Sequence, residues 1–150
     1  METITVKPGM ISSKEGDKYI ILGHEVTVKL HSEDGNNNFV FELITPPGAG
    51  IPPHVHQNED EVLYILKGEF DVTIGEEVFK ATTGDCLNCV RNIPHAYTNT
   101  GTADAKTLWY VSPGGSFEEF FAELSQFPPG PPDMEKFNAL CGKYGMTFLV

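Results

Sequence analysis

Two histidines and a nearby carboxylate are the residues of this chain whose types and spacing could do chemistry. His54 and His56 are separated by one residue, and Glu61 follows five residues after the second. In a β-strand, residues i and i+2 point to the same side, about 6.6 Å apart, so both imidazoles can converge on one ion. Glu61 has the wrong parity for an uninterrupted strand, and we expect the polar residues 57–60 to form a turn that resets the alternation. Two histidines and one carboxylate with room for further ligands are typical of open transition-metal sites, including those of oxygen-using iron enzymes.

A further ligand has to come from elsewhere in the chain, and His95 is the best candidate. It follows a proline, which fixes the approach of the backbone, and it leads into a strand-like run. The other histidines, His24 and His31, fall at the ends of predicted strands, where we expect surface or edge positions. Within the turn, Glu59 and Asp60 are alternative carboxylate ligands, but the spacing favours the glutamate after the turn.

Length, composition and charge predict a globular protein with one domain that does not bind nucleic acid. The 150 residues are 40% hydrophobic and 11% aromatic, which is enough to bury a core. Ten basic against twenty-one acidic residues give a net charge of −11, which argues against nucleic acid and anionic membranes. The sequence shows neither an apolar run long enough to span a membrane nor a signal peptide, so it predicts a cytoplasmic protein.

The chain has three cysteines, an odd number, so a full disulfide framework is excluded. Cys86 and Cys89 have C-x-x-C spacing, but a redox motif of this spacing opens a helix, and no second pair completes a zinc site. On a strand, positions three apart face opposite sides, which argues against a bridge between them. We interpret both as structural thiols.

Short β-like segments fill most of the chain. Val26, Val28 and Leu30 alternate with polar residues, which predicts a strand with one buried face, and residues 34–38 predict a hairpin into a strand at 39–44. Further strands are predicted at residues 3–6, 19–22, 62–66, 69–74, 78–80, 86–90, 96–99 and 105–111. The Pro- and Gly-rich residues 45–53 are expected to be irregular. About nine short strands without helices between them indicate an all-β sandwich or barrel.

Near residue 116 the apolar period changes from two to about 3.6, which predicts helices. Ser116, with Glu119 three residues later, is a predicted capping box. The apolar stripe of this helix consists of Phe117, Phe120, Phe121 and Leu124. The Pro-rich residues 127–132 end the helix, and Asp133 is the predicted cap of a second one. Stripes of this kind usually pack in a core or a dimer contact, and we do not expect them to line a ligand pocket.

The histidines and the glutamate of the candidate metal site match the first of two cupin signatures, and the chain resembles that family. The signature is a glycine, five residues, His-x-His, four residues, Glu, six residues and a glycine. Gly48, His54, His56, Glu61 and Gly68 satisfy every spacing.

The second cupin signature is a glycine, five residues, Pro-x-Gly, two residues, His, three residues and Asn. Gly84, His95 and Asn99 fit it, while Val90 and Asn92 replace the proline and the glycine. These two departures affect a turn and no ligand. Segments 112–121 and 143–146 also look like the tail of small quercetin dioxygenase-like cupins, so the resemblance covers about residues 38–150.

The resemblance implies a cupin double-stranded β-helix, that is, a jelly-roll barrel. One domain, residues 1–150, would comprise a barrel at about 18–112 and an extension of two short helices at about 113–150. By resemblance, one divalent transition metal ion (Fe, Mn, Ni, Co, Cu or Zn) is held by His54, His56, Glu61 and His95. A homodimer is also expected from the resemblance.

By the same resemblance, the chain is a metal-dependent, quercetinase-like dioxygenase that acts on a flavonol or a related enol or phenol. Glu61 would be both a metal ligand and the catalytic base for the substrate hydroxyl, and the partners would be the small-molecule substrate and dioxygen. Strand parity, and not the resemblance, makes Phe39, Phe41, Leu63 and Ile65 the expected pocket residues. Tyr97 and Asn99 share the parity of His95 and are candidates to support it, although Tyr97 could equally be a packing residue. The alternatives are a metal-dependent cupin isomerase or lyase for a small sugar or keto acid, and a non-catalytic small-molecule-binding module.

Overall fold

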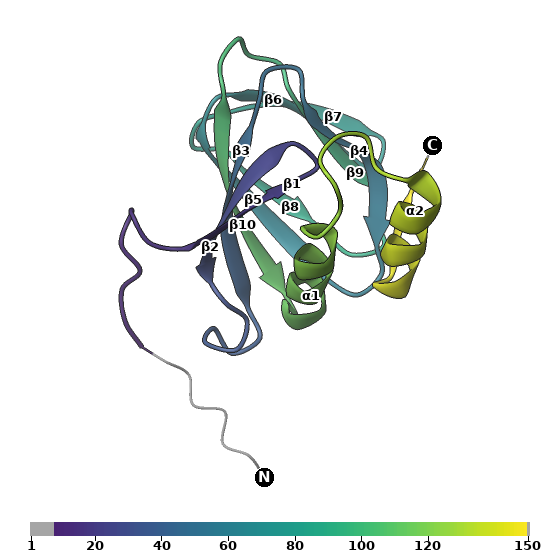
Figure 1. The fold of residues 1–150 in the computed structure, drawn as a ribbon. Helices are drawn as coiled ribbons and strands as arrows, with labels where there is room; N and C mark the ends of the chain where they lie inside the picture. The colour runs from purple at the N-terminus through teal and green to yellow at the C-terminus, as the bar shows by residue number, and fades with distance from the viewer. Residues whose placement is uncertain (1–7, 150) are drawn as a thin grey trace.

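A computed structural model describes residues 8–149, which form eleven strands and two helices (Figure 1). The first six strands are β1 (Asp17–Ile21), β2 (His24–Leu30), β3 (Phe39–Thr45), β4 (Gly50–His56), β5 (Asp60–Lys67) and β6 (Glu69–Ile74). The other five are β7 (Glu77–Thr82), β8 (Cys86–Cys89), β9 (His95–Asn99), β10 (Ala105–Ser112) and β11 (Met146–Phe148). The helices are α1 (Gly115–Leu124) and α2 (Met134–Lys143). The predicted all-β class is confirmed, whereas the strand predicted at residues 3–6 lies outside the described residues.

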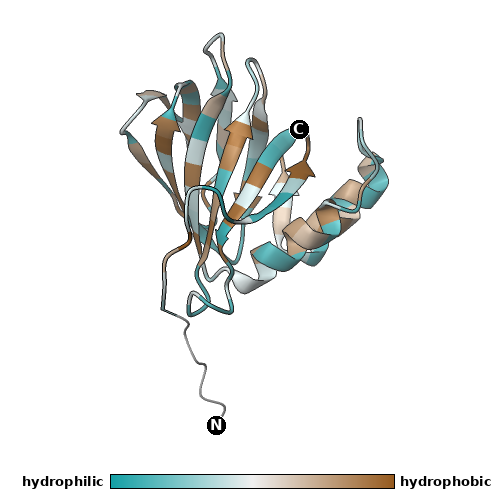
Figure 2. Cartoon of the chain, turned by 60° about the vertical axis from the view of Figure 1, so that its left-hand side comes forward, coloured by the Kyte–Doolittle hydropathy of each residue, from teal (hydrophilic) through white to brown (hydrophobic). Residues whose placement is uncertain are grey.

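Two antiparallel sheets make up the jelly-roll sandwich, and each contributes one wall of its interior. The six-stranded sheet has the order β1-β2-β3-β10-β5-β8, and the five-stranded sheet has the order β11-β4-β9-β6-β7. Both helices follow β10 in the chain and lie together on one side of the sandwich (Figures 1 and 2). Among the described residues, neither helix is long and apolar enough to cross a membrane.

Strand β3 illustrates how the sequence alternation produces the core. Phe39, Phe41 and Leu43 are buried, while the residues between them are partly exposed, as a pleat with one inward face requires. Trp109 of β10 lies opposite Phe41 and also opposite Leu63 of β5, so the central strands present bulky side chains to one interior. The alternation of hydrophobic and hydrophilic residues along the strands can be followed in Figure 2.

The first half of strand β4 lies in residues 45–53, which were expected to be irregular. That expectation is wrong for residues 50–53, which belong to the strand. Pro52 and Pro53 lie inside the strand, at a register shift between Ile51 and His54 in the pairing with β9. Because proline cannot donate a hydrogen bond to a ladder, a strand tolerates it at such an irregularity. The strand therefore continues into the two histidines with its pairing restored.

The two helix caps differ from one another in outcome. The predicted capping box at Ser116 is wrong, because α1 follows Gly114 without a side-chain cap, and Asn37 of the β2–β3 loop accepts a hydrogen bond from the Gly115 N–H at 3.0 Å. A side chain at position 114 would collide with Phe39, which places the helix start directly against β3. The cap at Asp133 is confirmed, since its carboxylate accepts from the N–H groups of Glu135 and Lys136.

The C-x-x-C pair is a pair of free thiols, as predicted. Cys86 is exposed and Cys89 is buried, so the two side chains face opposite sides of β8. Burial raises the pKa of the Cys89 thiol to about 12, which keeps it protonated and unreactive at neutral pH. The nearby Asn92 adopts a left-handed conformation with φ of 64°, so it performs the turn for which the cupin signature has glycine.

Candidate metal centre

Four buried side chains from three strands meet in the interior between the two sheets. His54 and His56 point inward from β4, and His95 of β9 is the pairing partner of His54. Glu61 comes from β5, in the opposite sheet. One ligand atom from each of the four lies within 4.8 Å of the others, so the structure brings together all four predicted site residues.

The chain crosses from one sheet to the other between β4 and β5, which explains why Glu61 does not follow the parity of the two histidines. Strand β4 ends at His56 and β5 begins at Asp60, so the alternation restarts after the turn. Two backbone hydrogen bonds hold the start of the turn: the Gln57 N–H donates to the Gly145 carbonyl at 2.9 Å, and the Asn92 N–H donates to the His56 carbonyl at 2.7 Å. The expected phase reset at residues 57–60 is therefore confirmed.

Hydrogen bonds fix the orientation of two of the three imidazoles. The Nδ1–H of His54 donates to the Pro52 carbonyl at 2.9 Å, and the Nδ1–H of His56 donates to the Glu59 carboxylate at 2.9 Å. In each ring this leaves the Nε2 lone pair free for an ion, which is the usual arrangement of metal-bound histidines. Glu59, which sequence spacing offered as an alternative ligand, thus lies behind His56 and is only 2% exposed.

Asp60, the other alternative ligand, points away from the centre. Its carboxylate forms an ion pair with Arg91 at 2.9 Å near the surface. The choice among the three acidic residues of this segment is therefore made by the turn: Glu61 faces the histidines, Glu59 supports one of them, and Asp60 joins the outer surface.

The polar atoms at the centre fit a divalent transition metal ion. Glu61 Oε2 lies 3.0 Å from His95 Nε2 and 3.4 Å from His56 Nε2. Within residues 8–149, Glu61 Oε2 and both ring nitrogens of His95 are buried without a hydrogen-bond partner. Buried polar atoms left unpaired cost free energy, and a cation bound between Glu61 Oε2 and one ring nitrogen of His95 would pair both of these atoms. Three imidazoles and one carboxylate are a donor set that suits Fe, Mn, Co, Ni, Cu or Zn.

The electrostatics of the cluster favour a negative carboxylate surrounded by imidazoles. Burial by itself would raise the pKa of Glu61, but His56, His95 and His54 outweigh it and lower the pKa to about 2. Burial and the neighbouring His95 and His56 lower the pKa of His54 to about 3, so this ring is neutral. Burial also opposes protonation of His56, yet the carboxylates of Glu61 and Glu59 raise its pKa overall.

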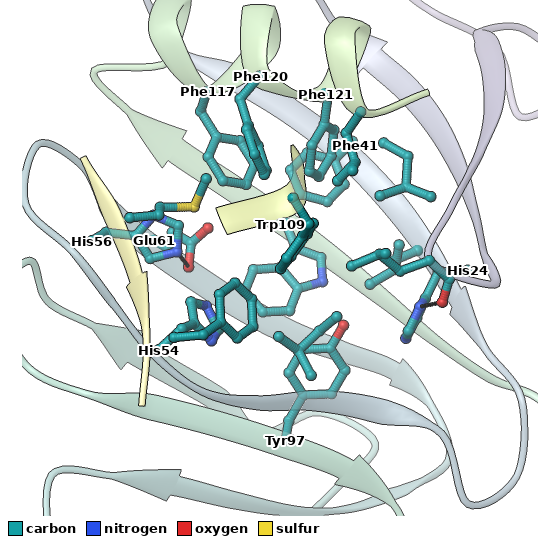
Figure 3. A pocket seen from close by; sticks show the side chains of 18 residues that line it. His24, Phe41, His54, His56, Glu61, Tyr97, Trp109, Phe117, Phe120 and Phe121 are labelled. Atoms are coloured by element: carbon teal, nitrogen blue, oxygen red, sulfur yellow. Dashed lines mark hydrogen bonds and ion pairs between the residues drawn. The ribbon is translucent and has the colours of Figure 1, made fainter. Parts of the chain in front are cut away.

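A cavity of about 80 Å³ adjoins the cluster, and its wall is mainly aromatic (Figure 3). The rings of Phe117 from α1 and Phe148 from β11 lie directly over the ligands, with ring centres 5.5 Å from His56 and 5.1 Å from His54, respectively. Phe120, Phe121, Leu124 and the α2 residue Phe137 also line the cavity. The expectation that the helical stripes would not line a pocket is therefore wrong, because the helices pack over an open end of the sandwich.

The other predicted pocket residues have mixed outcomes. Phe41 lines the cavity as predicted, whereas Phe39, Leu63 and Ile65 are fully buried in the core and do not. Tyr97, a candidate to support His95, lines the cavity as well. Asn99 does not support the metal ligands: its side-chain N–H groups donate to the carbonyls of Thr45 and Ala103, both at 2.9 Å, and so fasten a loop.

His24 departs furthest from its predicted position. It is 2% exposed and lines the cavity, although a surface or edge position was expected. A signal for this was present in the sequence, since His24 shares the parity of the buried residues Val26 and Val28 in β2. His31, which follows the end of the same strand, is partly exposed and bonds to Glu118 of α1.

Comparison with known proteins places this geometry in a family. The sequence model of the family described as "Cupin domain" matches residues 41–111. Quercetin 2,3-dioxygenase of Bacillus subtilis is 28% identical over 91 residues, which cover 60% of this chain and 27% of that protein. The tetracenomycin polyketide synthase protein TcmJ of Streptomyces glaucescens is 24% identical over 82 residues, which cover 55% of each protein.

The chain thus spans between about a quarter and about half of the length of these two relatives. Among solved structures, KdgF from Halomonas sp. superposes with a TM-score of 0.64 at 19% identity, over 71% of this chain and 94% of that one. The two-sheet fold, the converging histidines and glutamate, and the match to the family description agree with one another. The chain belongs to the cupin superfamily.

Proposed function

We propose that the protein is a metal-dependent dioxygenase acting on a flavonol or a related planar enol or phenol. The observation that carries the proposal is that three members of the cluster, His54, His56 and Glu61, line a cavity whose wall is otherwise almost entirely apolar. Apart from the cluster, only His24, Tyr97 and Trp109 contribute polar atoms to the lining, and the Trp109 N–H already donates to Thr107 Oγ1 at 2.9 Å.

Such a wall suits an aromatic ligand and does not suit a sugar. Aromatic rings gain from stacking against aromatic side chains, and here Phe41 and Trp109 already lie nearly parallel, at 4°. The several hydroxyl groups of a sugar would lose their hydrogen bonds to water without finding partners in this cavity. The wall therefore favours the dioxygenase proposal over an isomerase or lyase for a small sugar.

The residues of the chain would divide the work between binding and proton transfer. His54, His56, His95 and Glu61 would hold the ion, which, when bound, acidifies an enol or phenol oxygen and supplies the redox chemistry that dioxygen needs. Glu61 Oε2 would accept the proton of the substrate hydroxyl. Since the pKa of Glu61 is low, it can act as a base only toward a hydroxyl that has itself been acidified. The phenylalanines over the cluster would exclude water from this step.

The size of the cavity sets a condition on the substrate. About 80 Å³ is well below the roughly 300 Å³ at which pockets for drug-sized ligands begin. A three-ring flavonol would therefore enter only with an outward movement of the side chains or helices over the cluster. The similarity to quercetin 2,3-dioxygenase supports the substrate class at the level of the metal-binding domain, since the matched part is 27% of that protein.

A second candidate is a non-catalytic module that binds an aromatic small molecule. It is favoured by the same aromatic closure, because Phe117 and Phe148 lie directly against two of the metal-binding imidazoles and leave little room for a co-substrate. A third possibility is a reaction of an enolic substrate without oxygen, and the similarity to TcmJ, which is named as a polyketide synthase protein, directs attention to polyketide-like enols and phenols.

Oxygen uptake separates these functions. The metal-free protein is loaded in turn with Fe(II), Mn(II), Ni(II) and Co(II), and oxygen consumption is followed with a series of flavonols. Uptake that requires both metal and flavonol supports the dioxygenase. Product formation under anaerobic conditions would support the non-oxidative enzyme, and a ligand-induced rise in melting temperature without turnover would support the binding module. Absence of turnover with every bound metal rules out the dioxygenase.

A further inference from the structure

The wall of the cavity away from the metal-binding cluster carries an imidazole that the proposed chemistry does not use. His24 of β2 lies on the opposite side of the cavity from His54, His56 and Glu61 (Figure 3). It is 2% exposed, and within the described residues its Nε2 atom is buried without a hydrogen-bond partner.

A tight hairpin holds this imidazole in place. Ile21 and His24 are paired across the β1–β2 ladder, so Leu22 and Gly23 form a two-residue turn. Both turn residues have positive φ, 49° and 79°, which is the signature of a type I′ turn. Leucine rarely adopts this conformation, and it does so here with its side chain also lining the cavity. The turn thus places two lining residues at one rim.

The hydrogen bonding of His24 determines what it can offer a ligand. Its Nδ1 lies 3.1 Å from the Leu22 carbonyl, and since a carbonyl only accepts, Nδ1 must carry the proton. Burial lowers the pKa of the ring, so it is neutral and Nε2 presents a lone pair. An O–H or N–H group of a ligand would satisfy this buried acceptor, whereas a purely apolar ligand would leave it unpaired.

His24 lies next to Tyr97, which connects it to the metal-binding end of the cavity. Its ring centre lies 6.2 Å from that of Tyr97, in an edge-on arrangement. Tyr97 is two residues after His95 on β9, a step of about 6.6 Å along a strand. His24 and the cluster therefore line two ends of one cavity, so a planar ligand of two or three rings, for which the cavity has to widen, can reach both.

We propose that His24 is a specificity-determining residue that accepts a hydrogen bond from a second hydroxyl or N–H group, at the end of the ligand remote from the metal. The inference rests on the proposed function, because it assumes a planar enol or phenol anchored at the cluster. It adds a requirement that the cluster cannot impose: the preferred ligand carries a donor on its distal ring.

Two matched flavonols test the inference on the metal-loaded full-length protein. One carries a hydroxyl on the distal ring, and the other is identical but lacks it. Isothermal titration calorimetry gives the dissociation constant of each for the wild type, His24→Leu and His24→Gln. We expect the wild type to bind the hydroxylated flavonol about tenfold more tightly, the preference to fall to about onefold in His24→Leu, and part of it to return in His24→Gln, whose amide oxygen can accept the bond.

Metal content and melting temperature are measured for each variant, so that a loss of binding is not confused with a loss of the site. Equal binding of the two flavonols by the wild type overturns the role of His24 while leaving the proposed function intact. An unchanged preference in His24→Leu does the same. If neither flavonol binds although the metal is present, both the inference and the proposed substrate class are wrong. The wild-type comparison needs no variant, so it can overturn the role of His24 even if a substitution prevents folding.

Discussion

Glu61 combines two demands in one side chain, since it would bind the ion and accept a proton. We expect Glu61→Gln to weaken metal binding, because a neutral amide replaces the only negative charge among the four ligands. Turnover should remain depressed when metal is restored to saturation, because an amide cannot act as the base. Metal content and oxygen uptake at saturating metal measure the two effects separately.

Asp60→Asn is the matched control, since it makes the same change one residue away, on a carboxylate that faces Arg91 and not the cluster. It should leave metal content unchanged. If Glu61→Gln regains full activity once metal is replenished, the glutamate is a ligand but not the base.

Glu59 shows that a carboxylate can matter to the site without being a ligand. It accepts the Nδ1–H of His56 at 2.9 Å in a fully enclosed position, so it fixes the ring that must present Nε2 to the ion. We expect Glu59→Gln to lower metal affinity by about 10- to 100-fold, as is typical for such supporting groups. A competition titration with a chelator measures the change. Equal affinities in the variant and the wild type would show that the negative charge of Glu59 does not contribute to metal binding.

At the scale of elements, helix α1 is tied to the end of β2 by one side chain. The Glu118 carboxylate accepts hydrogen bonds from the Ser32 backbone N–H at 2.9 Å, from the Ser32 hydroxyl and from His31. Replacing it in Glu118→Gln should lower the free energy of unfolding by about 1–3 kcal/mol. Urea denaturation measures the loss, and Glu119→Gln, an exposed neighbour on the same helix, should change little. A variant as stable as the wild type would contradict this role for Glu118.

The hydrogen bonds of Glu118 also predict how the stability of the protein depends on pH. Bonds from Ser32 and His31 outweigh burial and lower the pKa of Glu118 below 4.5, so its contribution is present above pH 4.5 and is lost as the pH falls through the lowered value. For His31, Glu118 and Asp17 outweigh burial and raise the pKa above 6.5, so its contribution is present below pH 6.5 and is lost as the pH rises through the raised value. The difference in stability between wild type and Glu118→Gln should therefore be largest between about pH 4.5 and 6.5.

The sequence predicted the strands well and the helix contacts badly, for a physical reason. Alternation in a segment such as β3 reports burial on one face, whatever lies opposite, so it can be read locally. The apolar stripe of α1 reports equally that a face is buried, but not what it covers. That Phe117 lies against His56 depends on where the helix is docked, which is set by the close approach of Gly114 to Phe39. No spacing within the helix contains that information.

At the scale of the whole molecule, the candidate site was predictable because its ligands occur at fixed spacings within two short segments. The spacing of His54, His56 and Glu61, and the later His95, could be matched to a family without knowledge of the packing. The roles of His24 and Glu59 depend instead on contacts across the interior, such as the proximity of His24 to Tyr97. His24 was misplaced because a strand end was equated with the surface, although this strand starts at the rim of a cavity.

The placement of the ligands on two sheets leads to a prediction about global stability. His54, His56 and His95 belong to the five-stranded sheet, and Glu61 belongs to the six-stranded one, so a bound ion would link the two walls of the sandwich. An ion that binds only the folded state at 100 times its dissociation constant stabilises that state by about 2.7 kcal/mol. For a chain of this size, that corresponds to a rise of about 5–10 °C in melting temperature.

Differential scanning calorimetry of the protein with a chelator and with added metal measures this rise, and hydrogen exchange locates it. Because the link is between β4, β5 and β9, amide exchange should slow in these three strands. Strand β1, at the far edge of the six-stranded sheet, is an internal reference whose exchange should change less. Metal that is bound at the cluster but leaves both the melting temperature and the exchange of β5 unaltered would mean that Glu61 does not join the ion, and that the two sheets are held together by their apolar core alone.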